Sequence, residues 1–164
     1  MSDLADKIIN QINSSNAIEH LEGWIWKAGD LLQKASSKNY RSGFAEIDNE
    51  EISEADGQKI QAALLEALKR NSEARFVGTI LSALGGSNDQ SLKPIFVRYL
   101  SEHFNKLRES NSVVYSALCG LRNLGESVYE KNPDGGSSQS LIEVDKNIRQ
   151  ANKYLLEVGH KIHW

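Results

Sequence analysis

The sequence predicts an all-α protein of about seven helices. Apolar residues recur at intervals of three and four along most of the chain, for example across residues 18–35, which is the spacing of one helical face. The 164 residues include only two prolines, Pro94 and Pro133, so little interrupts helix formation. Strand signals are nearly absent. We expect a single helical domain spanning residues 1–164.

The first half of the chain contains three expected helices and one long loop. The apolar pattern places the first two helices at about residues 4–12 and 18–35. Residues 36–52 lose this pattern and are rich in Ser, Asn and Gly, which predicts a loop. Ser53 is the expected N-cap of the third helix, whose apolar face covers residues 60–68. A loop of this length is unusual in a compact domain and is often functional.

Two further helices are expected in the middle of the chain. Ser72 is the expected cap of the fourth helix, which should end at Gly85-Gly86 because glycine accepts the left-handed conformation at a helix C-terminus. The fifth should begin at Asp89 or Ser91, and Pro94 is tolerated because it falls in the first turn.

The last two expected helices are separated by a run of turn-forming residues. The sixth helix should begin at Asn111 or Ser112. Residues 132–139 are mostly turn-formers and should form a flexible surface loop. The seventh helix should begin at Ser140, with an apolar face that includes Val158 and Ile162.

Two of these helices share a motif about 40 residues apart. Residues 76–85 and 116–125 both end in Leu-x-x-Leu-Gly, and stacked helical hairpins repeat with a period of this size. Gly78 and Gly120 each cost about 1 kcal/mol in a helix interior, and close helix packing is a reason to keep them. On these residues, the region of about 60–130 resembles HEAT-like and armadillo-like α-solenoid repeats.

That resemblance implies a stack of helical hairpins that binds protein or nucleic acid along one face. It carries over no functional residues, because such families have no invariant ones. The alternative architecture is an irregular helical bundle.

The strongest local signal is an acidic segment at the end of the long loop. Residues 46–56 contain six acids and no base, although the whole chain has a net charge of only −3. Clustered charge of this kind speeds the encounter with a basic partner. We therefore expect partner contacts from five acids of the segment, which are Glu46, Asp48, Glu50, Glu51 and Glu54. A solvated loop is the alternative.

Trp26 adds an aromatic candidate to this surface. On a helix it points away from Trp24, which flanks the apolar face, and toward polar residues such as Asp30 and Gln33. An exposed Trp is a candidate interface anchor. The alternative is that the loop or the first helix covers it.

No pattern indicates catalysis, a cofactor or a metal. The acidic segment lacks the calcium-loop pattern, since Ile52 and Ser53 occupy the positions that need an oxygen ligand and a glycine. His160 and His163 lie one helical turn apart without a third ligand. His103 and Cys119 are each expected to be packed side chains. We expect no enzyme, no cofactor and no metal site.

Composition narrows the class of protein further. The single cysteine fits a reducing compartment, and we expect no signal peptide and no membrane span. A cytoplasmic, non-enzymatic protein-binding module is therefore the leading hypothesis. By type it resembles a bacterial immunity protein that neutralises a toxin, such as a basic nuclease. The alternatives are a helical-repeat protein that binds nucleic acid, and an enzyme whose site is assembled from distant residues such as His103.

Overall fold

All regular structure in the described part of the chain is helical. The computed structural model describes residues 2–14, 18–37, 39–106, 110–129 and 142–159, and it places no strand in these ranges. The all-α prediction is therefore confirmed. No helix in these ranges is both long enough and apolar enough to cross a membrane.

The described residues form eight α-helices and two 3₁₀ turns. Their bounds are α1 Asp3–Ser14, α2 Ile18–Ser36, α3 Ala45–Asp48, α4 Glu54–Arg70, α5 Ala74–Leu84, η1 Gly85–Ser87, η2 Gln90–Leu92, α6 Lys93–His103, α7 Asn111–Asn123 and α8 Val144–Glu157. The helix beyond the expected seven is α3, which lies within the expected 36–52 loop. The expected 132–139 loop, the expected start at Ser140 and the residues Ile162, His160 and His163 lie outside the described residues.

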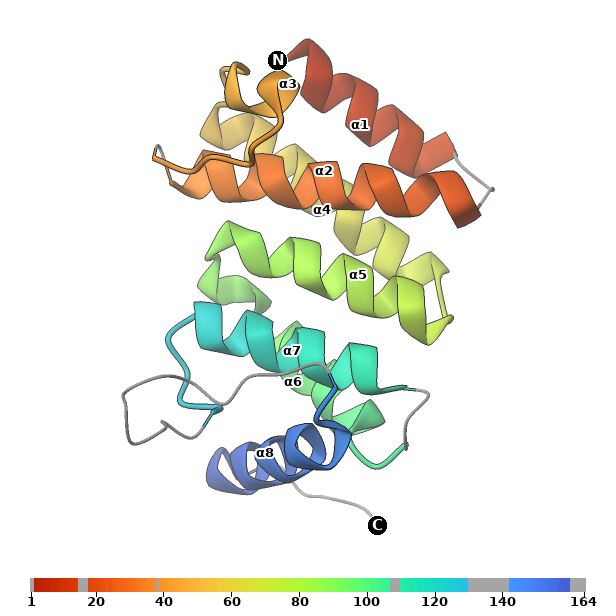
Figure 1. The fold of residues 1–164 in the computed structure, drawn as a ribbon, viewed down its shortest axis with the longest axis vertical. Coiled ribbons are helices and arrows are strands. Elements are labelled where there is room, and N and C mark those ends of the chain that lie inside the picture. Colours follow the sequence, from red (N-terminus) through yellow and green to blue (C-terminus); the bar gives the residue numbers. More distant parts are fainter. Residues whose placement is uncertain (1, 15–17, 38, 107–109, 130–141, 160–164) are drawn as a thin grey trace.

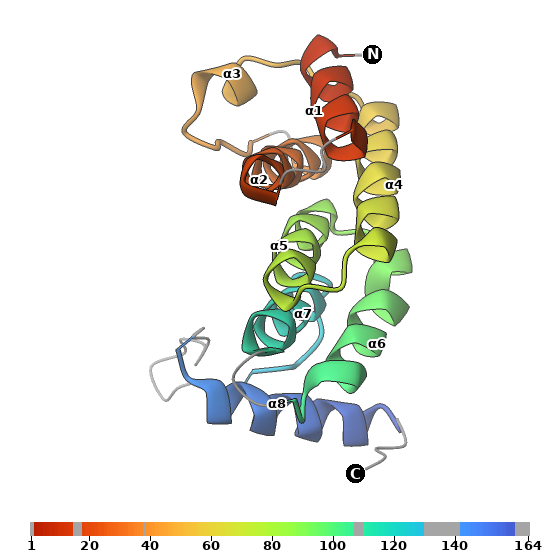
Figure 2. The ribbon, with the colours of Figure 1, turned by 90° about the vertical axis from the view of Figure 1, so that its right-hand side faces the viewer.

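The helices are arranged in two layers. In Figure 1, α2, α5 and α7 lie one below another in the front layer, and Figure 2 shows α4 and α6 forming the second layer. Helix α5 packs on both α2 and α7, while α4 packs on α2 and α6 packs on α7. Helix α1 covers α2 and α4 at one end, and α8 covers α7 and α6 at the other. This arrangement is compatible with stacked hairpins, and the HEAT-like repeat itself stays a prediction.

One continuous apolar core joins the layers. Every helix except α3 contributes several buried side chains, and α3 contributes Ile47. The largest fully buried members include Ile8, Ile25, Ile60, Ile80 and Phe96.

Small residues allow the front-layer helices to approach closely. A Cβ added to Gly29 of α2 would lie 3.0 Å from the Ala83 Cα of α5, and one added to Gly78 of α5 would lie 3.0 Å from backbone and side-chain atoms of Ser112. A Cβ on Gly120 would overlap the ring of Phe96. The prediction of close packing at Gly78 and Gly120 is therefore confirmed.

Helix ends agree with the expected caps in part. Ser53 forms a capping box with Asp56, and Pro94 lies in the first turn of α6. Ser72 is not a cap, because α5 begins at Ala74 after Glu73, whose side chain makes no capping hydrogen bond.

Helix α5 ends at Leu84, directly before Gly85, as expected. Two more detailed expectations, the left-handed glycine and the burial of Val158, are wrong. Gly85 has a right-handed conformation (φ −61°), because the chain continues into η1, and the left-handed residue is Asn88 (φ 54°). Val158, expected on the apolar face of the last helix, is exposed and lies directly after the end of α8.

A polar network fastens α8 to the rest of the fold. The Glu126 carboxylate accepts a hydrogen bond from Lys93 Nζ of α6 (2.7 Å) and another from the Tyr154 hydroxyl of α8 (2.8 Å). The Lys93 hydrogen bond, followed by that of Tyr154, holds the pKa of Glu126 below its usual value. Burial, with the neighbouring carboxylate, raises the pKa of Tyr154.

The glycine packing predicts opposite effects of one substitution at different sites. Gly120→Ala should lower the free energy of unfolding by about 1–3 kcal/mol, because Phe96 must move. Gly23→Ala is the matched control, since nothing lies within 4 Å of its added Cβ; it should stabilise α2 by up to about 1 kcal/mol. Chemical denaturation measures both, and equal effects would contradict the packing.

The Glu126 network predicts a pH-dependent stability difference. Glu126→Gln should cost about 1 kcal/mol at pH 7, because it removes the negative charge that strengthens the hydrogen bonds from Lys93 and Tyr154. A carboxylate with a lowered folded-state pKa stabilises the fold fully above its ordinary value of about 4.3 and loses this effect as the pH falls through the lowered pKa. The difference in unfolding free energy between the variant and wild type should therefore be full at pH 7 and shrink on acidification below about pH 4. A difference that does not change on acidification would rule out this role.

Candidate functional site

The acidic segment is an ordered loop that is docked on α2. Ile47 of α3 is fully buried. Lys34 Nζ of α2 donates hydrogen bonds to the carbonyl oxygens of Ile47 (2.8 Å) and Asp48 (2.6 Å). A cation at the end of a helix complements the carbonyl groups left unpaired there. The loop is therefore held by one apolar side chain in the core and by one charged side chain of α2.

Asp48 uses its carboxylate within the loop. It accepts hydrogen bonds from the Ser42 amide (2.7 Å), the Ser42 hydroxyl (3.0 Å) and the Gly43 amide (3.2 Å). The bond from the Ser42 amide is the main reason that the pKa of Asp48 is lowered. Gly43 has φ +83°, a conformation that side chains disfavour. Asp48 thus shapes the turn before α3.

The other acids of the segment fall into two groups. Glu46 forms an ion pair with Lys27 of α2 (2.6 Å), which lowers the pKa of Glu46. Glu50 accepts a hydrogen bond from the Ser2 hydroxyl. Glu51 and Glu54 are exposed. The structure therefore gives Glu46, Asp48 and Glu50 local partners, although Glu46 stays exposed, and Glu51 and Glu54 are exposed before and at the start of α4.

Trp26 lies on the open face of the front layer. Its side chain is 51% exposed, so neither the loop nor α1 covers it. It borders a depression of about 200 Å³ between α2, α5, η1 and the end of α7. Gly29, Ala83 and Gly86 keep this depression open, and Asp30 and Asn123 add polar groups. Trp24, by contrast, packs against the core, with Lys27 Nζ 4.9 Å from its ring centroid.

A tyrosine connects the docked loop to the Trp26 depression. The Tyr40 hydroxyl donates a hydrogen bond to Asp30 (2.5 Å), and Asp30 is one of the residues that line the depression. Burial and the Asp30 carboxylate raise the pKa of Tyr40 to about 12. The loop and the depression therefore share a border along α2.

Sequence reasoning missed two aromatic residues of this loop. Phe44, immediately before α3, is 60% exposed, and Tyr40 makes the contact with Asp30. Both stand out as large aromatic residues in an otherwise polar stretch, and that contrast was the available signal.

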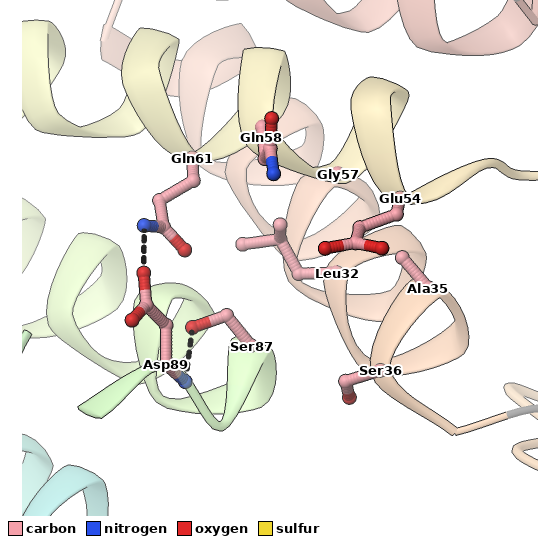
Figure 3. Close-up of a pocket in the computed structure, with 9 residues that line it drawn as sticks. All are labelled: Leu32, Ala35, Ser36, Glu54, Gly57, Gln58, Gln61, Ser87 and Asp89. Atoms are coloured by element: carbon pink, nitrogen blue, oxygen red, sulfur yellow. Dashed lines mark hydrogen bonds between the residues drawn. The ribbon is translucent and has the colours of Figure 1, made fainter. Parts of the chain in front are cut away.

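A second hollow lies beside the first, between α2, α4 and η1. This cleft has a volume of about 380 Å³, and Figure 3 shows the side chains that line it. Leu32 and Ala35 of α2 supply apolar surface, while Glu54 and Gln61 of α4 and Asp89 supply polar groups. The Ser36 hydroxyl of α2 donates to the Gly86 carbonyl (3.0 Å), so the contact between α2 and η1 separates the cleft from the Trp26 depression.

His103 and Cys119 both lie in packed surroundings. His103 stacks on Tyr99, and its Nδ1 lies 3.1 Å from the Ser110 hydroxyl. Burial lowers the pKa of His103. The Cys119 sulfur lies 3.8 Å from the Tyr129 hydroxyl. Among the described residues, no group of three or more His, Cys, Asp or Glu side chains could hold a metal ion.

The chain was compared with family models, curated proteins and solved structures. No protein-family model, curated protein or solved structure matches the chain. The candidate site consists of Trp26, the docked acidic loop and the adjacent cleft, all on or around α2.

Proposed function

We propose that this chain is a non-enzymatic protein-binding module whose contact surface is the Trp26 depression together with the docked acidic loop. The observation that carries the proposal is the half-exposed indole of Trp26 beside a depression bordered by that loop. The expected contact residues are Trp26, Glu46, Asp48, Glu50, Glu51 and Glu54, and Phe44 joins them because of its exposure.

The chemistry of the surface suits an interface anchor. Tryptophan is among the residues that contribute most to protein–protein binding, particularly where the partner can exclude water around it. The depression next to Trp26 gives a partner side chain a place to pack. The acids around it would select a basic partner and speed its approach.

The anchoring of the loop supports the same proposal. Ile47, Lys34 and Tyr40 hold the segment against α2 in the free protein. A segment that is already ordered loses less conformational entropy when a partner binds. Asp48 then contributes by fixing the turn, while Glu51 and Glu54 present their charges to solvent.

In its most concrete form, the proposal is a bacterial immunity protein that neutralises a toxin in the cytoplasm, with a basic nuclease as the expected target. The acidic segment supports this form, because its charge complements a surface built to hold nucleic acid.

Nucleic-acid binding is less well supported by the described surface. Three basic residues of α6 and α8 lie near carboxylates: Lys93 is 2.7 Å from Glu126, Arg98 is 3.9 Å from Glu102, and Lys146 is 3.4 Å from Glu143. Mixed charge of this kind does not favour tracking a phosphate backbone.

Replacing the aromatic anchor should weaken partner binding. With the partner recovered from nuclease-treated lysate of the source cells, Trp26→Ala should raise its Kd about 30-fold or more, since hot-spot residues contribute about 2 kcal/mol or more. Leu156→Ala is the matched control, because Leu156 is 61% exposed on α8 at the far end of the stack. Equal Kd values for the two variants would refute the Trp26 surface, and a partner lost on nuclease treatment would favour nucleic acid.

Reversing the solvent-facing acids should slow association. The double variant Glu51→Lys/Glu54→Lys should lower the association rate at low salt and flatten its salt dependence, because steering by exposed charge is screened by ions. Glu102→Lys/Glu157→Lys changes the net charge equally at exposed sites away from the loop. Stopped-flow or surface-plasmon measurements at several salt concentrations should distinguish the pairs. If the association rates of the two double variants depend on salt in the same way, the acidic segment is not part of the interface.

A further inference from the structure

The cleft between α2, α4 and η1 has the size and lining of a specific subsite. Its volume of about 380 Å³ lies within the range of about 300–1,000 Å³ that is typical of pockets for small ligands. Leu32 and Ala35 form an apolar surface, and Figure 3 shows polar side chains of α4 and Asp89 around it. Gly57 lies against Ala35 with no side chain of its own.

Several hydrogen-bond donors on the cleft wall are already used within the protein. Gln61 Nε2 donates to Asp89 Oδ2 (2.6 Å). The Ser87 hydroxyl donates to the Leu84 carbonyl (2.9 Å), and the Ser36 hydroxyl donates to the Gly86 carbonyl (3.0 Å). The two hydroxyl protons are therefore already used within the protein, whereas Gln61 Nε2 keeps a second N–H and the Gln58 amide adds further donors.

The charged side chains that line the cleft are both carboxylates, Glu54 and Asp89, and no Lys or Arg is among its lining residues in the described part of the chain. Glu54 and Gln61 both line the cleft, and Figure 3 shows the Gln61 side-chain oxygen turned away from Asp89. The hydrogen bond from Gln61 is the main reason that the pKa of Asp89 is lowered, which keeps this second carboxylate charged. A ligand that complements these two carboxylates is positively charged and donates hydrogen bonds.

We infer that this cleft takes the side chain of an arginine from the protein partner. Leu32 and Ala35 would pack against the methylene groups, and the Glu54 carboxylate with the Gln61 oxygen would accept from the guanidinium. A guanidinium carries five donors in a planar fork that matches a carboxylate. The inference rests on the proposed function, because the cleft adjoins the Trp26 depression across the contact between α2 and η1.

An NMR titration tests the inference without the partner. N-acetyl-arginine methylamide is added to the ¹⁵N-labelled full chain, and the side-chain amides of Gln58 and Gln61 with the backbone amide of Gly57 are followed. Saturable shifts are expected at these positions. The citrulline analogue has nearly the same shape without the charge, and it should bind at least about tenfold more weakly because charge-assisted hydrogen bonds are lost.

Two variants make the result specific. Glu54→Gln should weaken arginine binding at least about tenfold, and the exposed position of Glu54 leaves the fold intact. Gln58→Arg places a guanidinium four residues from Glu54, within reach on one helix face, and it should abolish binding by filling the cleft.

The inference is overturned if the arginine probe gives no saturable shifts, if citrulline binds equally, or if Glu54→Gln has no effect. If the titration fails but Trp26→Ala still weakens partner binding, the arginine inference is wrong and the proposed binding surface stands. If the cleft binds the arginine probe but Trp26→Ala binds the partner as tightly as wild type, the proposed Trp26 surface is wrong and arginine binding in the cleft stands.

Discussion

The close approach of α2, α5 and α7 is the constraint on which the rest of the structure depends. Gly29 meets Ala83, Gly78 meets Ser112, and Gly85 approaches Gly120 (3.3 Å from the added Cβ to its Cα). Small residues at these crossings bring the backbones together, and the lost side-chain area is recovered by apolar packing between the layers. The same small residues, with Gly86, keep the outer face shallow beside Trp26. The stack and its candidate binding surface therefore have one physical origin.

Charged and polar contacts attach two segments that bury few apolar side chains, the acidic loop and α8. Lys34 and Ile47 dock the acidic loop on α2, while Glu126 joins α6 to α8. The loop carbonyl groups accept hydrogen bonds from Lys34, and the Glu126 carboxylate accepts them from Lys93 and Tyr154. Segments far apart in the sequence are therefore held together with few buried side chains. Much of the acidic segment is therefore part of the fold, and its remaining exposed charge is concentrated at Glu51 and Glu54.

The sequence predicts the helices well because their apolar periodicity and caps are local properties. The Ser53 capping box, Pro94 in the first turn of α6 and close packing at Gly120 could all be anticipated. Features that depend on distant contacts could not. Helix α3 is held by Lys34 from another helix, η1 keeps Gly85 right-handed, and the cleft needs Gln61 beside Asp89. The exposure of Trp26 was one of two alternatives until the loop position was known.

The central claim is that the surface on α2 is already formed in the free protein. Amide hydrogen exchange of the isolated full chain tests it most directly, because the amides of Ile47, Asp48 and Asn49 donate to carbonyl groups of Phe44 and Ala45 within the docked loop. The account predicts that these three amides exchange much more slowly than those of an unstructured peptide, and that Lys34→Met speeds their exchange. Exchange at unstructured rates in the wild-type chain would contradict it, since the acidic segment would then lack a fixed place beside Trp26.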